Sequence, residues 1–203
     1  MRYLRKYNEE ITEEEADAAY KDKAGIYAEF GKIVCISVGI IGRNPETKEL
    51  FVRLKSFASE DESELLQNFS QMVTQYYNNT TTHAFCGHNI REFDMPYICR
   101  RLLINQLPLP NSLNIAGKKP WEIANLDTME LWKFGDYKNY TSLKLLTNVL
   151  GIPSPKDDID GSEVYSVFYQ ERNVDRIIDY CEKDTIAVAQ ILLRLRGDDL
   201  LTK

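Results

Sequence analysis

The alternation of apolar and polar positions predicts a chain that opens with a polar helix and continues into paired strands. Residues 9–22 are acidic with interspersed alanines, a pattern typical of an exposed helix. The run KIVCISVGII (32–41) is continuously apolar and rich in β-branched residues, so it predicts a buried strand. ELFVRLKSF (49–57) alternates, and the turn-forming residues 43–48 precede it. Together these two runs predict a β-hairpin.

The remainder of the chain alternates between helical and strand-like segments. Apolar residues at helical spacing predict helices over residues 59–77, 93–106, 141–151, 162–170 and 174–197. On the first of these, the apolar face comprises Leu65, Phe69, Met72 and Tyr76. Short strands are predicted at 83–89 and within 124–132, where a short helix follows. A hairpin followed by alternating strands and helices predicts a three-layer α/β domain covering residues 1–203, with residues 1–24 as its polar N-terminal helical segment.

The final predicted helix places a carboxylate where packing would favour a leucine. Its apolar positions are Ile177, Cys181, Val188, Ile191 and Leu195. Asp184 falls in the middle of the gap between Cys181 and Val188, so it lies on the core-facing stripe. Burying a carboxylate without a partner costs several kcal/mol, so a Lys, an Arg or a metal ion should face Asp184.

Tyr180 precedes Asp184 by four residues, so both side chains lie on the same face of the helix. Two readings remain open for this pair. Asp184 pairs with a buried arginine while Tyr180 belongs to the core, or both groups belong to a functional site.

A second candidate carboxylate lies in GHNIREFDMPYICRR, where a predicted strand leads into a helix. Asp94 is expected to cap this helix, with Met95 as the first helical residue and Pro96 tolerated in the first turn. Phe93 and Ile98 are then spaced as a hydrophobic staple. Capping explains Asp94 fully. Ligand sites in α/β sheets also form at such strand ends, where the short polar side chain of Asn89 could orient a sugar or a phosphate.

Composition and charge describe an ordinary globular chain. Hydrophobic residues make up 43% and charged residues 28% of the 203 residues, and no apolar run approaches the ~18 residues of a membrane span. The net charge of −6 argues against tight, non-specific binding of nucleic acid. Residues 88–156 nevertheless hold nine Lys or Arg against six Asp or Glu, while residues 157–203 hold eleven acids against six bases. Ordinary surface scatter explains this distribution on charge alone.

The four cysteines give no indication of a metal or disulfide framework. Cys35, Cys86, Cys99 and Cys181 are scattered, without a C-x-x-C pair. The N-terminus lacks the apolar segment of a secretory signal. A reducing, cytoplasmic setting is therefore expected.

Aromatic residues and lysines interleave in GKKPW (117–121) and LWKFGDYKNYTSLK (131–144). An aromatic core with lysines extending to solvent is the preferred interpretation. A base-stacking surface for nucleic acid is the alternative. Between these segments, Asp127 is expected to cap the short helix that follows it, with support of a nearby site as the second possibility.

Two segments together resemble the proofreading 3′–5′ exonucleases of the DEDD class, in the subclass with a tyrosine. The first is Asn89-Ile-Arg-Glu-Phe93-Asp94-Met-Pro96-Tyr97-Ile98, and the second is Tyr180-Cys181-Glu-Lys-Asp184. The similarity is to the exonuclease domain of family B DNA polymerases and to stand-alone bacterial domains predicted to be related to it. It covers roughly residues 25 to 195.

The resemblance implies an RNase H-like three-layer fold with a mixed central sheet, and hydrolysis of phosphodiester bonds at the 3′ end of single-stranded DNA. RNA remains possible as a substrate, and any polymerase partner is unknown. It also implies a two-metal mechanism with Mg²⁺ or Mn²⁺. Asp94 and Asp184 would bind metal, Tyr180 would position the attacking water, and Asn89 and Phe93 would contact substrate.

The first motif of that class, an Asp-x-Glu on the central strand, is missing from this chain. Asp22 and Glu29 are poor substitutes because neither has a strand-like run around it. The missing strand would lie between those at 32–41 and 83–89, so a broken sheet, or another segment in that place, is expected. A truncated, inactive exonuclease is therefore predicted, with a non-catalytic nucleic-acid-binding or protein-interaction module on the same fold as the alternative.

Overall fold

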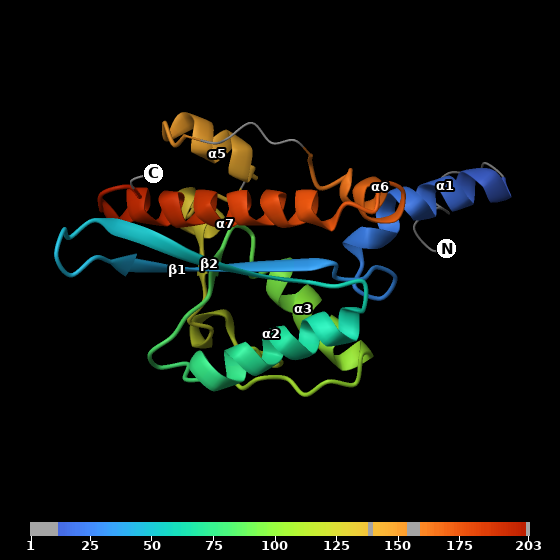
Figure 1. Ribbon diagram of the computed structural model, residues 1–203, viewed down its shortest axis with the longest axis horizontal. Coiled ribbons are helices and arrows are strands. Elements are labelled where there is room, and N and C mark those ends of the chain that lie inside the picture. The colour runs from blue at the N-terminus through green and yellow to red at the C-terminus, as the bar shows by residue number, and fades with distance from the viewer. Residues whose placement is uncertain (1–11, 138–139, 154–158, 202–203) are drawn as a thin grey trace.

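The computed structural model describes residues 12–137, 140–153 and 159–201, a mixed α/β arrangement with small sheets (Figure 1). Its strands are β1 (Cys35–Arg43), β2 (Leu50–Ala58), β3 (Cys86–Gly87) and β4 (Leu126–Asp127). Its helices are α1 (Glu13–Lys23), α2 (Glu62–Tyr76), α3 (Asp94–Ile104), α4 (Thr128–Lys133), α5 (Leu143–Val149), α6 (Val164–Tyr169) and α7 (Val174–Arg196). Two short 3₁₀ segments, η2 (Ala24–Ile26) and η3 (Pro120–Glu122), complete the set.

The predicted hairpin is confirmed. β1 and β2 pair antiparallel from Cys35 opposite Ala58 to Arg43 opposite Leu50. The connecting turn is held by the Asn44 side chain, whose Oδ1 accepts hydrogen bonds from the amides of Glu46 at 2.8 Å and Thr47 at 3.2 Å. Such local bonds between an Asn side chain and the following amides fix a tight turn.

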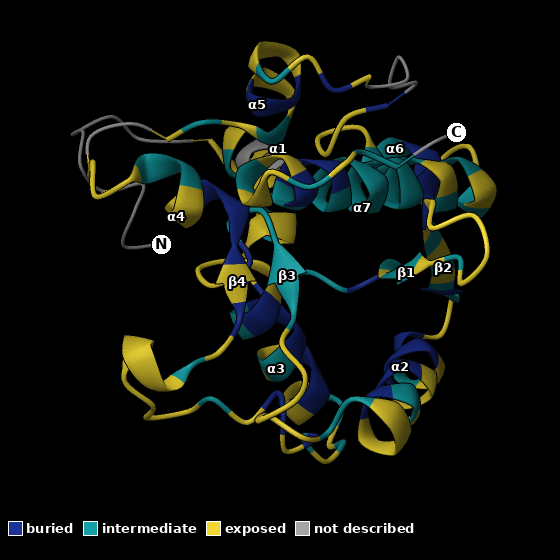
Figure 2. Cartoon of the chain, turned by 90° about the vertical axis from the view of Figure 1, so that its left-hand side faces the viewer, coloured by how far each residue is buried: buried dark blue, intermediate teal, exposed yellow. Residues whose placement is uncertain are grey.

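The sheet is split in two, as expected from the absence of the Asp-x-Glu strand. β3 and β4 form a parallel pair, and among the described residues neither is hydrogen-bonded to the β1–β2 hairpin. Viewed from the side, the hairpin and the β3–β4 pair stand apart (Figure 2). α7 contacts β1, β2 and β3, so this helix is the element that connects the two pairs of strands.

Helices lie on both sides of the strands. α5, α6 and α7 lie on one side, and α2 and α3 lie on the other (Figure 1). The largest core cluster includes Leu65, Leu66 and Phe69 of α2 together with Leu102 of α3. The predicted apolar face of α2 is wrong at one position: Tyr76 is 58% exposed, and the core position in the last turn belongs to Val73.

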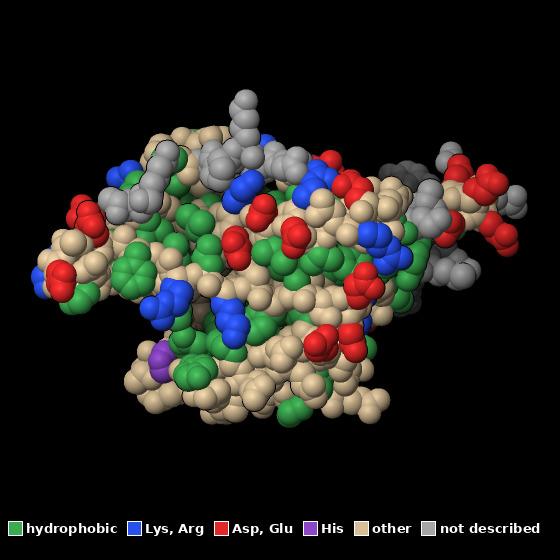
Figure 3. Space-filling view, in the orientation of Figure 1, with side chains coloured by type: hydrophobic (Ala, Val, Ile, Leu, Met, Phe, Trp, Pro, Cys, Tyr) green, Lys and Arg blue, Asp and Glu red, His purple; other side chains and the backbone are tan. Residues whose placement is uncertain are grey.

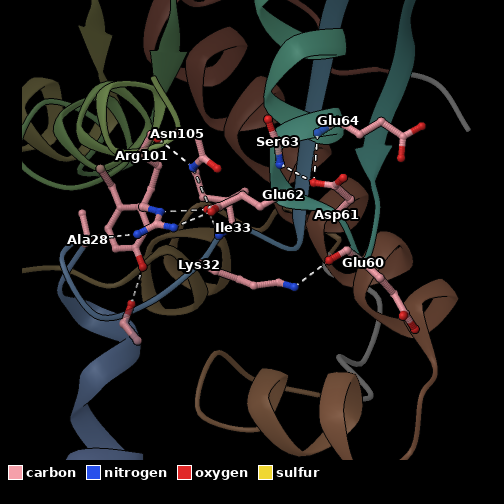
Figure 4. Close-up of polar contacts among 12 residues, drawn as sticks. Ala28, Lys32, Ile33, Glu60, Asp61, Glu62, Ser63, Glu64, Arg101 and Asn105 are labelled. Atoms are coloured by element: carbon pink, nitrogen blue, oxygen red, sulfur yellow. Dashed lines mark hydrogen bonds and ion pairs between the residues drawn. The ribbon is translucent and has the colours of Figure 1, made fainter. Parts of the chain in front are cut away.

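A buried ion pair joins α2 to α3 and to the segment that enters β1 (Figure 4). Glu62 and Arg101 are 7% and 9% exposed and are bonded to each other. Glu62 also accepts the Ile33 amide at 2.6 Å and the Asn105 side chain at 3.0 Å, and Arg101 donates to the Ala28 carbonyl at 2.8 Å. Because each charge has several partners, the desolvation cost of burying the pair is offset.

The N-terminal helix is polar and exposed, as predicted. Thr12 caps it and forms a reciprocal capping box with Glu15. Its acidic residues gather on the projecting end of the molecule (Figure 3). Within the described part of the chain, none of the helices combines the length and the apolarity needed to cross a membrane.

Candidate functional site

Asp94 is the first residue of α3, and the predicted capping role is wrong. The N-cap is Phe93, and no side-chain hydrogen bond caps this helix. Because the helix begins one residue earlier than expected, Asp94 lies in the first turn instead of at the cap, and its carboxylate accepts a hydrogen bond from its own amide. The staple also fails, since Phe93 is 43% exposed and its ring centroid lies 5.6 Å from that of Tyr97. Capping therefore does not account for Asp94, although the helix dipole still favours an acidic residue in the first turn.

Asn89 occupies a specialised position on the loop between β3 and α3. Its φ of 62° lies in the left-handed region, which asparagine adopts more readily than most residues. Its amide donates to Asp127 Oδ1 at 2.9 Å. Its own Oδ1 is buried, with no hydrogen-bond partner among the described residues. An unsatisfied buried acceptor is costly and is a place where a donor from a ligand or a water would be stabilising.

Asp127 holds this loop in place from the neighbouring strand. It is 2% exposed and accepts amide hydrogen bonds from Asn89, from Arg91 at 3.2 Å and from Met129 at 3.0 Å. The bond from Met129 caps α4, as predicted. The bonds from Asn89 and Arg91 show that Asp127 also supports the loop next to the candidate site. The Arg91 side chain adds a bond from Nε to the Asn125 carbonyl at 2.9 Å.

Tyr180 and Asp184 lie on α7, and both are half-buried. The apolar stripe predicted along this helix is buried at Ile177 and at Ile191, which are 1% and 0% exposed. Tyr180 packs against the core cluster that contains Ile177. Asp184 therefore lies between two buried apolar positions of α7, about two helical turns from each.

The charges of the two candidate carboxylates act on the same thiol. The pKa of Cys181 is raised, first by its hydrogen bond with Cys35 and by burial, and further by the negative charges of Asp184 and Asp94. Desolvation raises the pKa of Asp94 and the charge of Asp127 adds to the shift, while a hydrogen bond from its own amide opposes it; the residue itself is exposed. Asp94 and Asp184, ninety residues apart in sequence, thus lie in one acidic neighbourhood.

This neighbourhood is not a complete metal centre. Among the described residues, no group of three or more His, Cys, Asp or Glu side chains is arranged to hold a metal ion. Mg²⁺ and Mn²⁺ prefer several carboxylate and water oxygens, so Asp94 and Asp184 fit only part of a two-metal site. Glu29 does not complete it, because it lies in an exposed turn; the backbone of Asp22 lies in α1.

The preferred interpretation of the aromatic segments holds at Trp132, which packs against a core cluster, and is wrong for four other aromatic residues. These four side chains, predicted to form a core with extended lysines, are among the most exposed in the molecule: Trp121 (78%), Phe134 (85%), Tyr137 (94%) and Tyr140 (68%). Phe134 ends α4 in a left-handed conformation, which places its ring outside the packed interior. The spacing of apolar residues does not distinguish these exposed aromatic residues from core residues. Only their clustering with lysines could have indicated that they are exposed.

A family model described as "Predicted 3'-5' exonuclease related to the exonuclease domain of PolB" matches residues 26–198. No curated protein and no solved structure matches the chain.

Proposed function

Because the chain belongs to this family of predicted 3′–5′ exonucleases related to the exonuclease domain of PolB, we propose that it acts on the 3′ end of single-stranded DNA. The underlying fold is proposed to be RNase H-like and three-layered, with the first strand of its mixed central sheet absent between β1 and β3. The observation that carries the proposal is that the charges of Asp94 and Asp184, ninety residues apart in sequence, both raise the pKa of the Cys181 thiol.

The proposed roles follow from where each side chain lies. Hydrolysis of a phosphodiester needs a water molecule aligned with the scissile bond, and the Tyr180 phenol is assigned to position it. Asp184 lies on the same face of α7 as Tyr180, and Asp94 lies at the start of α3. The exposed ring of Phe93 is assigned to stack on the terminal base. The unsatisfied Oδ1 of Asn89 is assigned to accept a hydrogen bond from the terminal nucleotide.

Divalent metal belongs to the proposed activity, yet the described residues supply only part of its ligand set. Mg²⁺ or Mn²⁺ would supply charge neutralisation and an activated water in such a reaction. Asp94 and Asp184 are the proposed ligands from this chain. The remaining carboxylates are those of an Asp-x-Glu strand placed between β1 and β3. Without them, metal binding and activity are expected to be weak.

The exposed aromatic segment after α4 is proposed to guide the substrate strand. Phe134, Tyr137 and Tyr140 are exposed and follow α4 in the chain. His88 supports this arrangement, since its two ring nitrogens lie 2.9 Å from Thr128 Oγ1 and 2.7 Å from the Thr141 carbonyl. Bases of any sequence stack on exposed rings at about 1–3 kcal/mol each.

The test is a degradation assay on a 5′-labelled single-stranded oligonucleotide with Mg²⁺ or Mn²⁺. The chain of residues 1–203 is expected to shorten it very little. A variant carrying an apolar strand with Asp-x-Glu ahead of residue 25 is expected to produce a ladder from the 3′ end. In that variant, Asp184→Asn should lower the rate by about 10³-fold, whereas Asp179→Asn, an exposed neighbour on α7, should not. Robust degradation by residues 1–203 that Asp184→Ala abolishes would contradict the incomplete site.

The incomplete ligand set favours one alternative, a non-catalytic module that binds nucleic acid or a protein. Fluorescence anisotropy with single-stranded DNA, measured in EDTA, separates the two functions. Binding by both forms of the chain, with no shortening by the strand-restored form, supports the alternative. Shortening that depends on Asp184 supports the nuclease.

A further inference from the structure

Two cysteines face each other across the contact between α7 and β1. The register of this contact is fixed at Thr185, whose hydroxyl lies 2.8 Å from the Cys181 carbonyl oxygen and 3.3 Å from the Ser37 carbonyl oxygen. A Cβ added at Gly39 would lie 3.1 Å from Thr185 Cγ2. Thr185 therefore lies directly over β1 between Ser37 and Gly39.

The same register places Cys181 over Cys35. β1 and α7 run in the same direction (Figure 1). Four helical residues advance about 6 Å and two strand residues advance about 6.6 Å, so one turn back from Thr185 corresponds to two residues back from Ser37. The Cys35 side chain lies on the same face of β1 as that of Ser37, with Sγ 3.7 Å from Oγ. Both cysteines are half-buried and pack against one core cluster.

Small side chains bring the helix close to the strands at this point. The side of the hairpin turned to α7 carries Cys35, Ser37 and Ser56, and Ser56 donates to Glu182 Oε1 of α7 at 2.6 Å. A disulfide needs Cα atoms about 4.4–6.8 Å apart, and such separations require small residues on both elements. The small side chains at this contact are therefore compatible with a bond between the two sulfurs.

The electrostatics distinguish Cys35 from the remaining thiols. The hydrogen bond from Cys181 lowers the pKa of Cys35 and outweighs the opposing effects of burial and of the Glu182 charge. Burial raises the pKa of both Cys86 and Cys99 to about 11. Because the thiolate is the nucleophile in exchange, Cys35 is the sulfur expected to react first.

We propose that Cys35 and Cys181 form an oxidation site, a dithiol that low-molecular-weight disulfides convert into a bond between β1 and α7. The Cys35 thiolate attacks the reagent RSSR, forming a mixed disulfide and releasing RS⁻. Cys181 then loses its proton and attacks Cys35 Sγ, which forms the protein disulfide and releases the second RS⁻. Both protons end on the two released RSH molecules, so two thiols are oxidised and one reagent disulfide is reduced.

The modification would fasten the helix that carries Tyr180 and Asp184 to the hairpin. It does not depend on the proposed nuclease activity, because the reaction involves only the two sulfurs and the reagent. In the unfolded chain the same bond would close a loop from residue 35 to residue 181, and cross-links that close long loops stabilise the folded state.

The test is treatment of the folded chain with oxidised glutathione, followed by alkylation, trypsin digestion and mass spectrometry. Cys35 lies in the tryptic peptide 33–43 and Cys181 in the peptide 177–183. The expected product is these two peptides joined, two hydrogen masses below their sum. The urea midpoint of the oxidised protein should rise and should return with a reductant.

Matched variants control the assignment. Cys35→Ser and Cys181→Ser should each abolish the joined peptide, while Cys86→Ser should leave it unchanged. Glutathione retained on Cys35 without cross-linking would overturn the proposal, as would a joined peptide containing Cys86 or Cys99. Because the peptide map of the unaltered chain gives this result by itself, the outcome does not depend on the folding of any variant.

Discussion

At the scale of single residues, Asp127 determines the shape of the loop that carries Asn89. Its carboxylate accepts hydrogen bonds from amides of the loop after β3 and from an amide of α4, which follows β4. One buried side chain therefore fixes both the loop that enters α3 and the start of α4. A carboxylate accepts several hydrogen bonds at once, which an amide or hydroxyl side chain cannot do as well. Asp127 is therefore a positioning residue for the candidate site.

Replacing Asp127 with alanine should lower the free energy of unfolding by about 3 kcal/mol, because buried amides lose their acceptor and α4 loses its cap. Asp127→Asn keeps one acceptor oxygen and should cost clearly less. Urea unfolding followed by circular dichroism measures both. Equal stability of Asp127→Ala and the unaltered chain would show that the loop does not need this side chain.

The sequence identified the candidate residues better than it identified their local roles. Asp184 was predictable because a carboxylate on an apolar stripe stands out at helical spacing. The capping role of Asp94 was mispredicted by a single residue, since cap positions depend on local φ and ψ values that a pattern does not specify. The pairing of Cys35 with Cys181 was not foreseeable, because it depends on the register between two elements distant in sequence.

At the scale of elements, the Glu62–Arg101 pair fastens α2, α3 and the segment before β1 to one another. Burial alone would raise the pKa of Glu62, but the hydrogen bonds from Arg101, from the Ile33 amide and from Asn105 outweigh it and lower the pKa. The stabilising contribution of an acid with a lowered pKa is present above its ordinary value and is lost as the pH falls through the folded value.

Arg101→Met should lower the free energy of unfolding at neutral pH by about 3–5 kcal/mol, because it leaves Glu62 buried without its cation. As a control, Glu60→Gln removes the exposed ion pair with Arg172 and should cost less than about 1 kcal/mol.

Glu62→Gln gives the corresponding pH test. Its stability deficit relative to the unaltered chain should shrink as the pH falls below the ordinary Glu value of 4.5. Urea titrations at several pH values measure this difference, and a deficit that does not change with pH would contradict the charged state of Glu62.

The longest elements were the most predictable. β1, β2, α2 and α7 have strong periodicity, and the structure places them within a few residues of the expected ranges. The strand expected at 83–89 shrinks to Cys86–Gly87, because its only partner among the described residues is the two-residue β4. Strand length depends on pairing across the sheet, which a single segment does not reveal.

At the scale of the whole molecule, the split sheet leaves one edge of β1 without a strand partner among the described residues. The Asn44 amide, just past the end of β1, donates to the Glu49 carbonyl at 2.9 Å, so every second residue back from Asn44 faces β2 and Ser37 faces the open edge. In an antiparallel strand the amide and carbonyl of one residue point the same way, and alternate residues point to opposite edges. The direction of every amide in β1 follows from this one contact.

Hydrogen exchange along β1 should therefore alternate. Amides that face β2 should be protected, and amides on the open edge should exchange faster. The protected set is Ile36, Val38, Ile40 and Gly42, and the faster set is Cys35, Ser37, Gly39 and Ile41. Two-dimensional NMR in deuterated water resolves the individual amides. Uniform protection would indicate that another segment, or a second copy of the chain, occupies the open edge.

The bridging position of α7 has a consequence for how stiffly the two carboxylates are held. The hairpin and the β3–β4 pair are joined by side-chain packing, against α7 and within the largest core cluster, and such packing is more compliant than a ladder of backbone hydrogen bonds. The separation of Asp94 and Asp184 is thus set by a deformable contact. A strand inserted between the two pairs would make that separation rigid. The same strand would therefore complete the sheet and fix the distance between the two carboxylates.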